Sequence, residues 1–126
     1  MRGVPKDQPD SLLLVEDEPL VAMSLADALE EFGFRVSLCG TGFDALNYIE
    51  MEDSIAAVVT DIRLGNGPDG WEVARRAREH FPGATIVYIT GDSAAEYSTE
   101  GVPKSVILQK PFPTADLINT VSALLH

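Results

Sequence analysis

Short apolar runs alternate with amphipathic stretches along most of this chain, and this alternation restricts the fold more than any other feature. Five of the runs have the length of buried strands, and they cover residues 11–15, 35–38, 55–60, 85–89 and 106–109. The stretches between them place apolar residues at helical spacing, as in the series Val21, Leu25 and Leu29. Alternating strands and helices predict an α/β fold, a doubly wound parallel sheet with helices on both faces.

Residues suited to helix ends bound several of these stretches. Pro19 and Gly33 fit the start and the end of the first helix, and Thr41 can cap the second. The fourth helix, expected over residues 93–100, has few apolar residues and is the least defined element.

Polar residues that could carry chemistry stand where four of the apolar runs end. They are Glu16 and Asp17 after the first run, Asp61 after the third, Thr90 after the fourth and Lys110 after the fifth. The carboxyl ends of parallel strands meet at one edge of a sheet, where such sheets bind their ligands. Any one of these residues alone would most simply be a cap or a surface residue, but their joint placement predicts a site.

The residue types in this set favour a metal ion and a phosphoryl group. Three carboxylates close together repel one another, and a divalent cation removes the conflict. Oxygen ligands without His or Cys favour Mg²⁺ or another hard cation such as Mn²⁺ over zinc. A carboxylate can also act as a nucleophile and form an aspartyl-phosphate, whose oxygens an ammonium and a hydroxyl group could bind.

Charge and composition limit the partners that we expect. The net charge of −11 works against direct nucleic-acid binding, because that needs Lys and Arg to neutralise phosphates. No apolar run approaches the ~20 residues of a membrane span, and no secretory signal is recognisable. The single Cys39 cannot form an internal disulfide, which favours the cytoplasm. Residues 1–10 have the composition of a tail or linker, and residues 11–126 are expected to form one domain.

Several short motifs together resemble the receiver domain of two-component response regulators. In chain order they are Leu12–Glu18, Val58–Asp61, Asp69–Gly70, Tyr88–Gly91 and Gln109–Phe112. They span the chain from about Ser11 to its end, and the set is specific although each motif alone is weak. The resemblance implies a flavodoxin-like strand order, 2-1-3-4-5.

The resemblance also implies a role for each site residue. Asp61 would accept a phosphoryl group from a phosphohistidine on a sensor histidine kinase or a histidine phosphotransfer protein. Asp17 and Asp61 would bind Mg²⁺ directly, Glu16 through water, and Arg63 through its backbone carbonyl.

The remaining implied roles concern the phosphoryl group and the switch. Lys110 would pair with Asp61 and then with the phosphoryl group, and the Thr90 hydroxyl would bond a phosphoryl oxygen on activation. The Lys110–Pro111 peptide bond is expected to be cis. Signalling would then pass to a downstream protein that the sequence does not identify.

The chain departs from the family pattern at the switch and in the loop after Asp61. Ile107 stands where most relatives have an aromatic residue that rotates on phosphorylation. Gly65 replaces a common Pro, and the Asp-Gly pair comes one residue later than usual. Arg63, Gly91 and Asp92 flank the expected phosphoryl position, and we expect them to tune the rate of phosphoryl hydrolysis.

Other functions and contexts stay open. The chain could be a single-domain regulator or the receiver part of a hybrid histidine kinase. It could also signal without phosphorylation, as a homodimerisation module. A phosphohydrolase with an aspartyl nucleophile is less favoured, because Arg63 occupies the place of the second Asp that the dehalogenase-like class needs. No phosphate loop of the Gly-x-x-x-x-Gly-Lys type is present.

Overall fold

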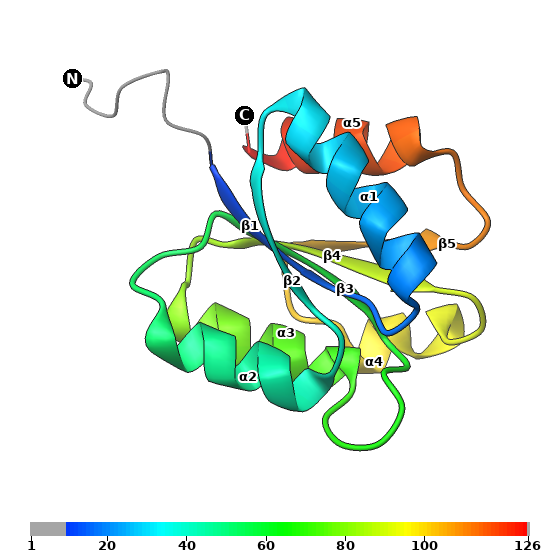
Figure 1. Ribbon diagram of the computed structural model, residues 1–126. Coiled ribbons are helices and arrows are strands. Elements are labelled where there is room, and N and C mark those ends of the chain that lie inside the picture. Colours follow the sequence, from blue (N-terminus) through cyan, green and yellow to red (C-terminus); the bar gives the residue numbers. More distant parts are fainter. Residues whose placement is uncertain (1–9, 126) are drawn as a thin grey trace.

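A five-stranded parallel sheet forms the centre of the computed structural model, which describes residues 10–125 (Figure 1). The predicted tail at residues 1–10 therefore lies outside the described residues, apart from Asp10. The strand order is β2-β1-β3-β4-β5, which confirms the expected flavodoxin-like order. The strands are β1 (Ser11–Val15), β2 (Arg35–Cys39), β3 (Ala57–Asp61), β4 (Thr85–Thr90) and β5 (Ser105–Gln109).

Helices cover both faces of the sheet, as predicted. Figure 1 shows α1 (Pro19–Phe32) and α5 (Thr114–Leu125) on one face, with α2 (Gly42–Met51) and α3 (Gly70–His80) on the other. Alternate residues of one strand face opposite layers: Leu12 and Leu14 pack with α1 and α5, while Leu13 packs with α2 and α3. This doubly covered arrangement explains why β3 and β4 are buried along their whole length and mostly apolar.

The termini of the first two helices follow the local signals in the sequence. Pro19 is the first residue of α1, and Gly33 ends that helix with a positive φ of 124°. The Thr41 side chain accepts a hydrogen bond of 3.0 Å from the Asp44 amide and so caps α2.

The fourth helical segment covers nearly the predicted span of 93–100 but is not one continuous α-helix. It consists of a 3₁₀ turn at Ala94–Glu96 and the single-turn helix α4 (Tyr97–Glu100). Neither piece contains a buried residue, so little apolar burial supports a longer helix here.

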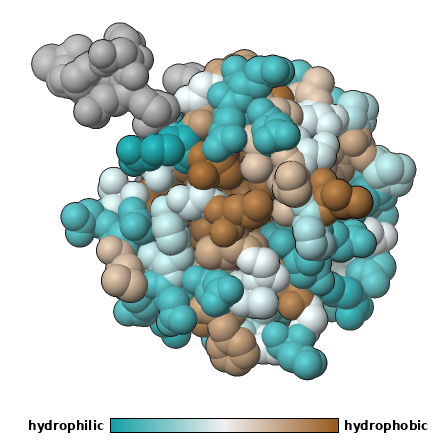
Figure 2. Space-filling view, viewed as in Figure 1, coloured by the Kyte–Doolittle hydropathy of each residue, from teal (hydrophilic) through white to brown (hydrophobic). Residues whose placement is uncertain are grey.

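The edge strand β2 leaves part of the apolar interior at the surface. Figure 2 shows apolar side chains along the edge strand β2, between the helical layers, where Leu38 is exposed. Among residues 10–125, no helix combines the length and the apolar composition that crossing a bilayer requires.

Candidate functional site at the carboxyl edge of the sheet

Strand register brings the predicted acidic residues together at the carboxyl edge of the sheet. Val15 of β1 lies opposite Thr60 of β3, so the residues that follow them, Glu16 and Asp61, are neighbours. Carboxylate oxygens of Glu16, Asp17 and Asp61 lie within 4.8 Å of one another. Glu16 and Asp61 are buried, whereas Asp17 is exposed. The set is therefore a half-enclosed acidic pocket that is open to solvent on one side.

The Lys110 side chain reaches into this pocket from the end of β5. Its Nζ atom lies 3.2 Å from Asp61 Oδ2 and 3.5 Å from Glu16 Oε1. The Lys110 amide donates a 2.7 Å hydrogen bond to the Thr90 carbonyl, and the following Lys110–Pro111 bond is cis. The amine is thus fixed between two of the three carboxylates.

Burial and mutual repulsion perturb the carboxylates. Burial, reinforced by the charge of Asp61, raises the pKa of Glu16 to about 7. Burial also raises the pKa of Asp61, although the ammonium of Lys110 opposes the shift. Glu16 Oε1 is buried and, within the described residues, has no hydrogen-bond partner. One ammonium does not balance three carboxylates, so the donor set fits a hard divalent cation.

The Thr90 hydroxyl lies at the end of β4 and is buried. Its Oγ1 atom accepts hydrogen bonds from the amides of Ser93 (2.7 Å) and Asp92 (3.2 Å), and so holds the turn after the strand. Sequence reasoning missed Ser93, whose own hydroxyl donates to Asp92 Oδ1 at 2.9 Å. A Ser three residues after a strand-end Thr is too common in loops to single out.

Two of the three residues expected to tune hydrolysis, Arg63 and Asp92, are paired with each other. Arg63 Nε lies 2.9 Å from Asp92 Oδ1, and both side chains are exposed. This hydrogen bond lowers the pKa of Asp92 and raises that of Arg63. At Gly91, an added Cβ would meet no atom within 4 Å, so that side of the pocket is open.

The residues around the atypical switch position form a packed aromatic group. Ile107 of β5 is half-buried and lies opposite Tyr88 of β4. Tyr88 is fully buried, packs on Trp71 at a ring distance of 4.7 Å, and accepts a 3.1 Å hydrogen bond from the Val102 amide. Tyr88 is therefore a core residue in this conformation.

The loop between β3 and α3 is held at both ends by close backbone contacts. The Gly70 amide donates a 2.7 Å hydrogen bond to the Ile62 carbonyl, and a Cβ on Gly70 would lie 2.2 Å from the Asp61 carbonyl oxygen. Gly67 has a φ of 97° and packs against the ring of Phe43 on α2. The Asp69 side chain caps α3 through the Glu72 amide at 3.0 Å.

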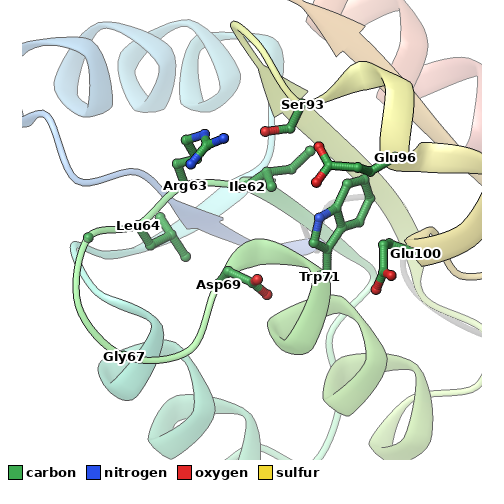
Figure 3. A pocket seen from close by; sticks show the side chains of 10 residues that line it. Ile62, Arg63, Leu64, Gly67, Asp69, Trp71, Ser93, Glu96 and Glu100 are labelled. Atoms are coloured by element: carbon green, nitrogen blue, oxygen red, sulfur yellow. The ribbon is translucent and has the colours of Figure 1, made fainter.

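A separate cleft of about 660 Å³ lies beside the acidic pocket (Figure 3). The β3–α3 loop forms one wall and the segment from Ser93 to Glu100 forms the other. Figure 3 shows Trp71 between these walls. Sequence reasoning did not anticipate this cleft, because its residues carry no motif and meet only in the folded chain.

The chain is similar to proteins of a known family. It matches the family described as response regulator receiver domain over residues 12–122. The response regulator receiver protein CpdR of Brucella abortus (strain 2308) is 34% identical over 116 residues, covering 90% of this chain and 95% of CpdR. Two other curated relatives are longer, and the chain spans only 43% and 61% of their lengths.

Solved structures show the same likeness. A response regulator receiver protein from Sinorhizobium medicae WSM419 has a TM-score of 0.90 and 43% identity, covering 94% of this chain and 95% of that one. The receiver domain of sensor histidine kinase PA1611 from Pseudomonas aeruginosa PAO1 has a TM-score of 0.74 and 25% identity, covering 93% and 98%. A magnesium ion is coordinated in the active site cleft of the PA1611 structure.

Proposed function

Because this chain belongs to the response regulator receiver domain family, we propose that it is a switch controlled by phosphorylation of Asp61. The phosphoryl donor would be a phosphohistidine on a histidine kinase or a histidine phosphotransfer protein in the cytoplasm. The observation that carries the proposal is the position of Lys110 Nζ, 3.2 Å from Asp61 Oδ2, in a pocket where three carboxylates converge. The output would be protein binding, and receiver homodimerisation is one form that it could take.

In the proposed reaction, an Asp61 carboxylate oxygen attacks the phosphorus atom. The new P–O bond forms as the P–N bond to the donor imidazole breaks, and the imidazole leaves with the bonding electron pair. Lys110, already beside the carboxylate, then pairs with a phosphoryl oxygen. Thr90 would give up its contacts with the Ser93 and Asp92 amides to bond another phosphoryl oxygen.

Mg²⁺ would be held by Asp17 and Asp61, with Glu16 acting through water and Arg63 supplying its backbone carbonyl. When bound, Mg²⁺ supplies positive charge against both the carboxylates and the phosphoryl oxygens. The raised pKa of Glu16, a consequence of burial beside Asp61, supports this assignment because a cation would relieve the repulsion.

Intact-mass spectrometry after incubation with Mg²⁺ and acetyl phosphate tests the proposal. The wild-type protein should gain one phosphoryl group, and Asp61→Asn should gain none. Asp27→Asn, which changes an exposed carboxylate on α1, is the matched control and should be phosphorylated like the wild type. If neither an acetyl phosphate adduct nor beryllofluoride binding is detected, the chain signals without phosphorylation, and dimerisation becomes the leading alternative.

We further propose that the Arg63–Asp92 pair sets the lifetime of the phosphoryl group. The pair joins the loop after Asp61 to the turn after Thr90, beside the open position at Gly91. Arg63→Ala and Asp92→Ala should each change the dephosphorylation rate, measured by loss of the mass adduct after the donor is removed. Equal rates in the wild type and both variants would refute this role.

A further inference from the structure

The cleft beside the acidic pocket offers a hydrogen-bond donor without a partner. The Trp71 side chain is 5% exposed and lines the cleft, and its indole N–H makes no hydrogen bond within residues 10–125. The indole nitrogen is not among the buried side-chain atoms that lack a partner, so it is accessible from the cleft. Figure 3 shows the indole nitrogen on the side of the ring that faces Asp69, away from Glu100. The indole N–H is therefore free to donate to water, and a ligand in the cleft that carries an acceptor would replace that water.

The charges around the cleft are predominantly negative. Asp69, Glu96 and Glu100 contribute three carboxylates, against the single guanidinium of Arg63. Asp92 already neutralises that guanidinium at 2.9 Å, and Glu100 has only a longer contact of 3.4 Å with Arg75. Glu96 forms no ion pair within the described part of the chain. A cationic ligand therefore matches the cleft, and a phosphate-rich one does not.

The cleft also has an apolar component. Ile62 and Leu64 line it and are both 3% exposed. A suitable ligand thus combines a positive charge, an aliphatic portion and a hydrogen-bond acceptor within a volume of about 660 Å³.

We propose that this cleft is a docking site for a segment of a partner protein that contains Lys or Arg. The cationic side chain lies between Glu96 and Glu100, its aliphatic stem covers Leu64, and a main-chain carbonyl accepts the hydrogen bond from the Trp71 indole. A polypeptide supplies both groups at once, because each Lys or Arg is flanked by carbonyls. A protonated polyamine offers only donors and cannot accept a hydrogen bond from the indole N–H.

The position of the cleft connects it to the proposed switch. Arg63 follows Asp61 by two residues, and Ser93, bonded to the Thr90 hydroxyl, lines the opposite wall. The assignment of the cleft as an output surface rests on the proposed function. Docking itself does not require phosphorylation, so the test is made on the wild type without a phosphodonor and on Asp61→Asn.

The single Trp71 provides a specific reporter, because its indole N–H gives one resonance in a ¹H–¹⁵N spectrum. The probe is the blocked pentapeptide Ac-Ala-Lys-Leu-Arg-Ala-amide, with Ac-Ala-Glu-Leu-Glu-Ala-amide and spermidine as comparisons. The cationic peptide should shift the indole resonance saturably in both the wild type and Asp61→Asn. The acidic peptide should cause no shift, and spermidine should not move the indole proton downfield as a hydrogen bond does.

Two variants and a matched control separate docking from general attraction to an acidic protein. Glu96→Gln should weaken peptide binding about threefold, while Glu79→Gln, which removes an exposed carboxylate of α3 outside the cleft, should not. Trp71→Phe should weaken binding about fivefold through loss of the donor, with affinity followed by backbone resonances. Absence of an indole shift, or equal weakening by Glu96→Gln and Glu79→Gln, would overturn the proposal. If the cationic peptide binds but acetyl phosphate does not phosphorylate Asp61, only the proposed phosphorylation switch is refuted.

Discussion

The environment of Glu16 differs strongly from that of a free side chain in water. Glu16 is buried at the end of β1, beside Asp61 and 3.5 Å from the Lys110 ammonium. Its pKa is raised to about 7, mainly by burial and then by the Asp61 charge. Folding thus makes this carboxyl group a weaker acid, and that coupling must appear in the pH dependence of stability.

We predict that the metal-free protein loses stability as pH rises from about 4.5 to about 7, through Glu16 ionisation. Below the unfolded value of 4.5 the group is protonated in both states; above it, the unfolded state releases the proton more readily. The loss should be at most about 3 kcal/mol, from 1.36 kcal/mol for each pKa unit. Urea unfolding in EDTA across this range measures it.

The matched variant for this prediction is Glu16→Gln, which keeps the shape of the side chain and removes the charge. Its stability should fall less between pH 5 and 8 than that of the wild type. Asp27→Asn, on the exposed face of α1, should leave the wild-type profile unchanged. A profile of equal slope in the wild type and Glu16→Gln would contradict the assigned cause.

The convergence of the acidic residues and Lys110 could be predicted because strand ends fix their positions. A residue that ends or directly follows a parallel strand lies at the carboxyl edge of the sheet, as Asp61, Glu16 and Lys110 do. The mutual pairing of Arg63 and Asp92 was not predicted. It depends on the path of two loops, which local sequence does not determine.

At the scale of elements, the junction between β3 and α3 places the site most directly. Helix α3 begins at Gly70, whose missing side chain allows the helix to approach the Asp61 backbone. A Cβ there would lie 2.2 Å from the Asp61 carbonyl oxygen and 2.7 Å from Ile62 Cα. Since both are backbone atoms, neither can rotate away.

We predict that Gly70→Ala destabilises the fold by about 1–3 kcal/mol and slows phosphorylation of Asp61. Alanine gains up to about 1 kcal/mol of helix propensity over glycine, but displacement of the strand end should outweigh that gain. Chemical denaturation gives the stability, and the rate of mass gain with acetyl phosphate gives the reactivity.

Gly83→Ala is the control for this substitution, because an added Cβ there meets nothing within 4 Å and the backbone φ is not in the left-handed region. It should change stability by no more than about 0.5 kcal/mol. If Gly70→Ala behaves like Gly83→Ala in both measurements, the close approach of α3 does not position Asp61.

Helices and strands were predicted well from the sequence where apolar patterning and capping residues indicate the same boundaries, and less well where these signals are weak. The β1, β4 and α1 boundaries follow apolar runs and the Pro19 and Gly33 signals. The segment after β4 was predicted as one helix over 93–100 but forms a 3₁₀ turn and a single helical turn. Without buried side chains, its geometry depends on neighbours such as Ser105, which bonds Tyr97.

At the scale of the whole molecule, alternating apolar runs were sufficient to predict the doubly covered parallel sheet. The cleft lined by Trp71 was not predictable, because it arises from the packing of α3 against a loop and a short helix. The strongly acidic character, a net charge of −11, was visible in the sequence. The effect of this net charge on the stability of the folded state depends on where the charged groups lie. Three carboxylates lie together at one edge of the sheet.

Because three carboxylates gather at one edge of the sheet, we predict that Mg²⁺ stabilises the fold. The ion would bind the folded state and not the unfolded state, in which the three carboxylates are apart. A Mg²⁺ concentration one hundred times the dissociation constant adds about 2.7 kcal/mol to the free energy of unfolding. For a domain of this size each kcal/mol raises Tm by about 4 °C, so thermal unfolding should shift by about 10 °C.

General screening of the acidic surface would also raise Tm, so the specific part must be isolated. NaCl at the ionic strength of the Mg²⁺ buffer measures screening alone, because monovalent salt weakens repulsion between exposed charges without bridging the three carboxylates. Asp17→Asn should retain the NaCl response and lose most of the additional Mg²⁺ shift, whereas Asp27→Asn should retain both. An equal Mg²⁺ shift in Asp17→Asn and Asp27→Asn would mean that the ion acts through the overall charge, and the acidic pocket would then not be its binding site.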